Sequence, residues 1–125
     1  MSTVFSKIIR GEIPSYKVYE DEKNYAFLDI KPETAGHVLV VPKVEVGKVY
    51  ELDDADYEAL WRAVRKVARN MEKVLGKRIL IKVIGTDLPD HAHVHLVPFD
   101  AEWYQGRVVK MTPVAMEEMA GKLRF

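Results

Sequence analysis

Three of the four histidines in this chain fall at alternate positions within five residues, at His91, His93 and His95. The residues between and after them are Ala, Val, Leu and Val, which favour a partly buried strand over a loop. Successive side chains of a strand point to opposite faces, so this spacing places all three imidazoles on one face, ~7 Å apart. Because polar groups rarely crowd a buried face, we interpret the run as a functional site.

The pattern alone is compatible with three interpretations of these histidines. They can be satisfied structural groups, or they can bind a metal, since a His-x-His pair supplies two ligands to zinc. The chain contains no cysteine, so a further metal ligand would have to come from elsewhere. In the third interpretation one imidazole is a nucleophile while its neighbours orient it and protonate a leaving group. The pattern favours this covalent chemistry and leaves the metal site open.

Composition limits the class of protein. A length of 125 residues predicts one domain, residues 1–125, large enough to bury a core without disulfides. Nineteen basic and nineteen acidic residues give no basic stripe for a nucleic-acid backbone. The absence of cysteine excludes disulfides and fits a cytoplasmic protein. No signal-peptide core or membrane-spanning run is visible, so we expect no membrane partner.

The distribution of apolar residues predicts an α+β fold. Apolar residues recur at helical spacing from a cap at Asp53 or Asp54 through to Gly76, which predicts one long helix. Alternating or β-branched runs predict strands over 15–20, 24–30, 37–41 and 78–84, followed by the histidine run. Short helices are expected over 3–10, where Gly11 and Pro14 end the helix, and over 116–122.

The histidine run, His-Ala-His-Val-His-Leu-Val, resembles the signature of the histidine triad (HIT) family. Residues 5–14, 18–30 and 36–43 also resemble the family's first helix, first hairpin and next strand, in the same order. The match runs from about Val4 to Pro98 and leaves 99–125 as a C-terminal extension. It implies the histidine triad fold, an antiparallel sheet with one long helix and short terminal helices. It also implies a homodimer that forms through the long helix and a sheet edge.

The resemblance implies covalent catalysis on a purine nucleotide of the AMP type, without a cofactor. His93 corresponds to the nucleophile, which attacks the α-phosphorus and forms a nucleotidyl-histidine that water then hydrolyses. His91 and His95 would stabilise phosphate charge or position the nucleophile. His37, the fourth histidine, would support the cluster by hydrogen bonding; the alternative is a half-buried strand histidine without a role.

The resemblance also implies a nucleotide-binding surface. Asp29, at a strand end, is expected to accept hydrogen bonds from the ribose hydroxyls. Its alternative role is to cap the turn at Lys31-Pro32. The apolar slot for the base would be formed by Phe5, Ile8, Phe27 and Ile30, with Val4 and Ile13 at its edge.

Three regions depart from the family pattern. Thr3 and Ser6 stand where many members have a zinc-binding Cys pair, so we expect no metal there. Val83 stands where members often have Asn, and no Gln-Ser pair follows before Asp90. Thr86 and Asp87 could supply the missing polar contacts. In the C-terminal extension, Trp103, Tyr104, Gln105 and Arg107 could reach over the phosphate site or could be plain surface.

The predicted activity is hydrolysis of nucleoside 5′-phosphoramidates or related AMP conjugates, or of dinucleoside polyphosphates. Three alternatives remain open at this stage. A nucleotidyl transferase would use a second acceptor in place of water. A nucleotide-binding sensor would bind without appreciable turnover, and a metal-dependent hydrolase would use His91, His93 and His95 as ligands.

Overall fold

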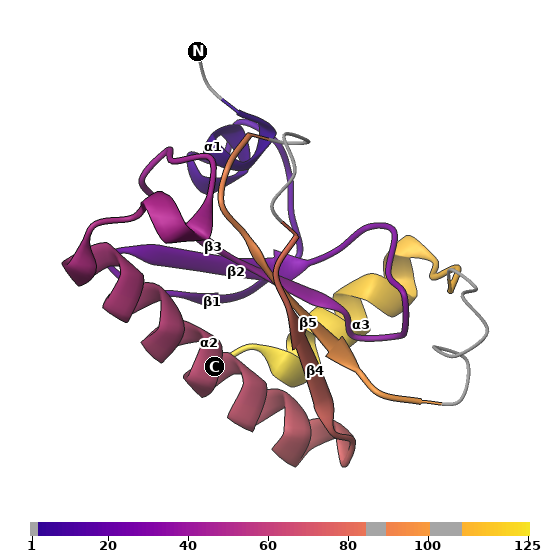
Figure 1. Ribbon diagram of the computed structural model, residues 1–125. Coiled ribbons are helices and arrows are strands. Elements are labelled where there is room, and N and C mark those ends of the chain that lie inside the picture. Colours follow the sequence, from indigo (N-terminus) through magenta and orange to yellow (C-terminus); the bar gives the residue numbers. More distant parts are fainter. Residues whose placement is uncertain (1–2, 85–89, 101–108) are drawn as a thin grey trace.

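A computed structural model describes residues 3–84, 90–100 and 109–125. Its five strands form one antiparallel sheet in the order β1-β2-β3-β5-β4, flanked by helices (Figure 1). This confirms the predicted α+β class. In chain order the elements are α1 (Val4–Ile9), β1 (Lys17–Glu20), β2 (Asn24–Leu28), β3 (Val38–Pro42), the 3₁₀ helix η1 (Val49–Glu51), α2 (Asp54–Leu75), β4 (Ile79–Lys82), β5 (Val94–Pro98) and α3 (Pro113–Leu123).

Helices α2 and α3 cover one face of the sheet and build the main core (Figure 1). Helix α2 buries a stripe that repeats every three or four residues: Leu60, Ala63, Val64, Val67 and Met71. As predicted, Asp53 caps its first turn by accepting from the Asp56 N–H, and Gly76 ends it in the left-handed conformation at φ 66°. None of the described helices, the 22-residue α2 included, has the length and apolar composition that crossing a bilayer requires.

The short helix α1 packs on the opposite face of the sheet. There Phe5 joins a second buried cluster with Tyr25 and Phe27 of β2 and Leu39 and Val41 of β3. Strand alternation explains the division, since the residues between them on β2 and β3 belong to the main core. The face under α1 is the one that carries the histidines.

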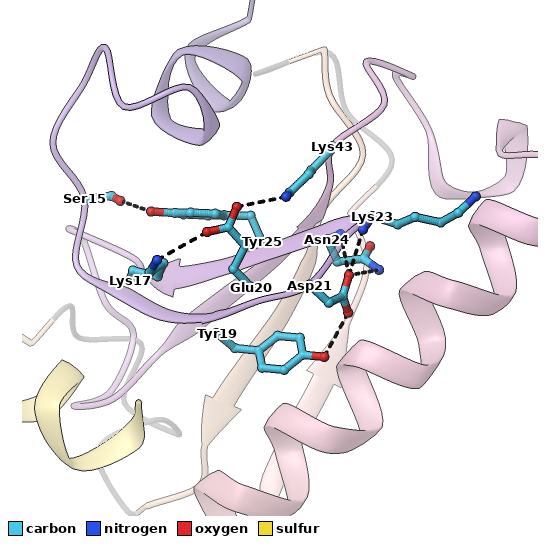
Figure 2. Close-up of polar contacts among 9 residues, drawn as sticks. All are labelled: Ser15, Lys17, Tyr19, Glu20, Asp21, Lys23, Asn24, Tyr25 and Lys43. Atoms are coloured by element: carbon cyan, nitrogen blue, oxygen red, sulfur yellow. Dashed lines mark hydrogen bonds and ion pairs between the residues drawn. The ribbon is translucent and has the colours of Figure 1, made fainter. Parts of the chain in front are cut away.

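The hairpin between β1 and β2 is fixed by its own side chains (Figure 2). Asp21 accepts hydrogen bonds from the backbone N–H groups of Lys23 and Asn24, at 2.9 and 2.8 Å, and from the Tyr19 hydroxyl. Glu20 links the hairpin to the end of β3 through Lys43, 2.8 Å away. These contacts hold β2 in the register that places Phe27 opposite Leu39.

The element boundaries differ from the sequence expectation in two informative places. Strand β5 begins only at Val94, after the first two histidines of the run. The ladder with β3 stops there because Pro42 has no N–H to donate and its carbonyl accepts from the His91 ring instead. The terminal helix is longer than predicted, because Thr112 caps it and Pro113 suits its first turn.

Candidate functional site

All four histidines meet on the α1 face of the sheet. His95 lies on β5 opposite Leu39, His37 immediately precedes β3, and His91 and His93 lie in the segment that leads into β5. The alternation predicted from sequence persists through that segment, because Ala92 and Val94 between them are buried in the main core. The rings of His93 and His95 have centroids 5.0 Å apart, and those of His37 and His95 are 5.1 Å apart.

The surroundings of His93 leave one of its ring nitrogens available. Its Nδ1 lies 2.8 Å from the backbone carbonyl of His91, which can only accept, so Nδ1 carries the hydrogen. Nε2 therefore keeps its lone pair in the neutral ring, and no described residue bonds to it. Phe5 packs edge-on against the His93 ring at 5.3 Å and against His91 at 5.7 Å, which fixes the plane of both rings. This geometry leaves Nε2 able to act as a nucleophile.

A backbone amide sets the proton positions on His37 and His95. The Glu33 N–H donates to His37 Nδ1 at 3.0 Å, so the His37 hydrogen is on Nε2. His37 Nε2 is 2.9 Å from His95 Nδ1 and donates to it. His95 consequently carries its own hydrogen on Nε2, and no described residue accepts it. The cluster thus presents a lone pair on His93 beside an N–H donor on His95.

Burial keeps these rings neutral. Removal from water lowers the pKa of His37 to about 4, with the Glu33 charge opposing the shift and Lys82 adding to it. Burial lowers the pKa of His95 to about 4 as well, and neighbouring His37 adds to the shift. Burial also lowers the pKa of His91. A neutral His95 can donate a hydrogen bond from Nε2 near pH 7, which can stabilise negative charge on a phosphate oxygen or a departing group.

Asp29 lies beside this cluster at the end of β2. One carboxylate oxygen accepts from the Lys31 N–H at 2.8 Å, which is the turn-capping contact considered from the sequence. The other oxygen lies 3.6 Å from His37 Nε2. Because His37 is neutral, this approach is not an ion pair. Burial raises the pKa of Asp29, and a ribose contact through the second oxygen remains a prediction.

A positive charge that the sequence analysis missed lies next to the histidines. Lys82 on β4 is the cross-strand partner of His95, so their side chains share a face. Its Nζ is 2.5 Å from Glu33, the residue whose backbone N–H holds His37. Lys82 lies beside His95 only because β4 pairs with β5. No pattern in the sequence indicated that Lys82 would lie near the histidines.

The residues predicted to bind the base are only partly gathered. Phe5 and Phe27 are buried with ring centroids 5.6 Å apart, and Ile8 packs against their cluster. Val4 and Ile30 are exposed, Ile30 at 75%, and Ile13 is half-buried. Thr86, Asp87, Trp103, Tyr104, Gln105 and Arg107 lie outside the described residues.

Comparison with known proteins assigns the family. The family model for the HIT domain matches residues 10–102, most of the chain. The chain belongs to the HIT family. Among HIT relatives, Protein hit of Bacillus subtilis is 53% identical over 101 residues, which are 76% of this chain and 69% of the relative. An adenosine 5′-monophosphoramidase of Candida albicans is 36% identical over 106 residues, 78% of this chain and 70% of that enzyme.

Solved structures of HIT proteins share the fold. A Hit-like protein from Bartonella henselae superposes with a TM-score of 0.85 at 30% identity, covering 98% of this chain and 95% of that one. A Zn-bound histidine triad family protein from Mycobacterium smegmatis superposes with a TM-score of 0.81 at 27% identity, covering 99% and 91%. The histidine triad fold predicted from the sequence is thereby confirmed.

The residues of this chain do not fit a zinc ion beside α1. Thr3 and Ser6 offer hydroxyls, whereas structural zinc sites are built from Cys, His and carboxylate ligands. Both ring nitrogens of His91 already have partners: Nε2 lies 2.7 Å from the Pro42 carbonyl and Nδ1 lies 2.7 Å from the Thr3 hydroxyl. His91 is therefore engaged on both sides without a metal.

A second group of ligand types, Asp29, His37 and His95, brings three ligand atoms within 4.8 Å of one another. The proton positions oppose a metal here as well. The Glu33 N–H keeps the His37 hydrogen on Nε2, so that nitrogen has no lone pair to offer. His95 Nδ1 already accepts the hydrogen of His37 Nε2, so its lone pair is engaged as well. The geometry supports hydrogen-bond donation by His95 better than metal binding.

Proposed function

We propose that the protein hydrolyses AMP conjugates with an amine leaving group, nucleoside 5′-phosphoramidates, through a nucleotidyl-His93 intermediate. The observation that carries this proposal is the pairing of a free Nε2 lone pair on His93 with an Nε2 hydrogen on the adjacent His95. Three relatives at 35–36% identity are named adenosine 5′-monophosphoramidases, which supports the same substrate class.

In the proposed mechanism each histidine has a separate role. His93 Nε2 forms a bond to the α-phosphorus while the bond from phosphorus to the leaving nitrogen breaks. His95 donates a hydrogen bond from Nε2 to the phosphate or to that nitrogen, which takes its proton from solvent water, and His37 supports His95 through the bond to Nδ1. Water then attacks phosphorus and gives its proton to solvent, which balances the proton taken up by the amine, and the N–P bond to His93 breaks to release AMP. His91, with both ring nitrogens engaged, serves to position His93.

The nucleotide would bind over the same face. Asp29 would receive the ribose hydroxyls on its second carboxylate oxygen, and Phe5, Phe27 and Ile8 would supply the apolar wall for the base. Exposed Val4 and Ile30 would be covered by the bound base, and Ile13 would lie at the edge. A cytoplasmic homodimer that forms through α2 and one edge of the sheet belongs to the same proposal.

The test is AMP release by metal-free protein from an AMP-lysine phosphoramidate and from diadenosine tetraphosphate, with His93→Ala as the control. We expect release from the phosphoramidate that survives EDTA and disappears in the variant. Faster release from diadenosine tetraphosphate would shift the substrate class to dinucleoside polyphosphates. No release from either, with AMP still bound, would replace hydrolysis with a sensor role. Loss of release in EDTA would overturn the metal-free mechanism.

A further inference from the structure

The amino-terminal end of α1 is tied to two distant parts of the chain by a continuous set of hydrogen bonds. The Thr3 hydroxyl caps the helix by accepting from the Ser6 N–H at 3.1 Å and lies 2.7 Å from His91 Nδ1. One carboxylate oxygen of Glu45, in the loop after β3, accepts from the Thr3 N–H at 2.6 Å and from the Ser6 hydroxyl at 2.7 Å. We call Thr3, Ser6 and Glu45 the α1 clamp.

The direction of each bond in the clamp follows from its fixed ends. The Pro42 carbonyl can only accept, so the His91 hydrogen is on Nε2 and Nδ1 accepts. The Thr3 hydroxyl has a single hydrogen and two acceptors in reach, His91 Nδ1 at 2.7 Å and the Ser6 hydroxyl at 3.3 Å. The contact to His91 Nδ1 is the shorter of the two, so the Thr3 hydroxyl donates its hydrogen to that nitrogen. The Ser6 hydrogen goes to Glu45, so every hydroxyl hydrogen of the clamp has an acceptor.

The clamp reaches His93 through the backbone of His91. The His91 carbonyl accepts the Nδ1 hydrogen of His93 at 2.8 Å, and the next backbone N–H, of Ala92, donates to Val46 at 2.7 Å. Val46 is the neighbour of Glu45, so the same loop holds both the clamp and the segment that carries His93. A rotation of the His91 ring or backbone would therefore turn His93 Nε2.

We propose that Thr3, Ser6 and Glu45 are positioning residues that hold the His91 ring in one tautomer and orientation and thereby aim Nε2 of His93. None of the three touches the reacting atoms; they act through His91. The effect on turnover rests on the proposed function, whereas the effect on the His91 ring does not. The two parts can be measured separately.

The decisive variant is Thr3→Val, which keeps the branched shape of residue 3 and removes its hydroxyl. The variant also removes a helix cap, so the matched control is Thr112→Val, which removes the equivalent cap of α3, a helix that packs into the main core on the other face of the sheet. Thr3→Ser restores the hydroxyl. Glu45→Ala and Glu45→Gln form a second pair, because glutamine keeps an acceptor oxygen at the same place.

The first measurement is the ¹⁵N spectrum of the imidazoles in the substrate-free protein. We expect the His91 Nδ1 resonance of wild type to show a hydrogen-bonded acceptor and to move to the free-acceptor position in Thr3→Val. The His91 Nδ1 resonance should return to its wild-type position in Thr3→Ser and should not move in Thr112→Val. Glu45→Ala should move the resonance in the same direction by less, and Glu45→Gln should restore it. An unchanged Nδ1 resonance in Thr3→Val, or in Glu45→Ala if Thr3→Val does not fold, would overturn the proposal.

The second measurement is steady-state turnover of the AMP-lysine phosphoramidate. A small misplacement of a nucleophile lowers rates steeply, so Thr3→Val should lower kcat about 10- to 100-fold with KM nearly unchanged. Thr3→Ser should recover most of the lost kcat, and Thr112→Val should keep the wild-type kcat. An equal loss in Thr112→Val would reduce the clamp to a stability element and overturn its positioning role. If wild type hydrolyses nothing, the proposed function has failed and the ¹⁵N spectrum alone decides the clamp.

Discussion

His37 Nε2 and His95 Nδ1 lie 2.9 Å apart, and the Glu33 N–H on the far side of His37 decides which of them carries the hydrogen. A backbone donor cannot change its role, so it fixes the tautomer of His37 and, through it, the tautomer of His95. The nitrogen from which His95 donates a hydrogen bond is thus set by a loop amide on the far side of His37.

Replacing His37 should disturb His95 before it disturbs the fold. In His37→Phe, His95 Nδ1 loses its donor, and we expect both neutral tautomers of His95 in the ¹⁵N spectrum. Because one positioned donor to developing charge contributes about 10²- to 10³-fold, kcat should fall by at least about tenfold. His37→Gln, whose amide can donate from a similar place, is the control and should retain more activity. Wild-type turnover in His37→Phe would exclude this role for His37.

Stability should depend on pH through the buried histidines. Folding lowers the pKa of His37 and of His95 from 6.5 to about 4, so between these values the unfolded chain binds protons that the folded protein does not. The free energy of unfolding therefore has its full value above about pH 6.5 and decreases as pH falls towards 4. Each group contributes up to about 1.4 kcal/mol per pH unit.

Urea unfolding at pH values spaced roughly evenly from 7.5 to 4.5 measures how steeply the free energy of unfolding depends on pH. His37→Phe should show a smaller slope over the same window, because one of the titrating groups is gone. An identical slope in the variant would mean that His37 is not held neutral by burial.

Lys82 should help to keep His37 and His95 neutral. Its positive charge lowers the pKa of both rings, and its removal also leaves the opposing charge of Glu33 unpaired. In Lys82→Met we therefore expect both pKa values to rise above about 4 in an NMR titration. Lys77→Met, which breaks the comparable ion pair with Asp100 at the other end of β4, should leave them unchanged. Equal shifts in the two variants would point to a general effect of net charge.

One buried hydroxyl, that of Thr34, anchors the loop between β2 and β3 to the end of β5. Thr34 is fully buried, donates to the Pro98 carbonyl at 2.6 Å and accepts from the His37 N–H at its own carbonyl. In Thr34→Val the Pro98 carbonyl loses its partner, which costs about 1–3 kcal/mol of unfolding free energy. Urea unfolding measures this loss, and Thr34→Ser should recover most of it. A loss below about 0.5 kcal/mol would show that another donor replaces the hydroxyl.

Local signals placed much of the fold correctly. The spacing of Leu60, Val64, Val67 and Met71 predicted α2, and its caps at Asp53 and Gly76 were visible in the sequence. The start of β5 was predicted too early. The alternation of His91 and His93 continues the strand pattern, but Pro42 on the neighbouring strand ends the ladder, and no local signal carries that information.

The same distinction between local sequence signals and tertiary contacts applies to the candidate site. By itself the sequence determined the alternation that puts His91, His93 and His95 on one face, together with the resemblance that identified the family, because both depend on spacing along a single segment. The tertiary structure decided which nitrogen carries the hydrogen in His37, His91 and His95, since that depends on partners from distant segments: the Glu33 N–H, the Pro42 carbonyl and the Thr3 hydroxyl. It also brought Lys82 beside His95, because strand pairing joins residues that no sequence period relates.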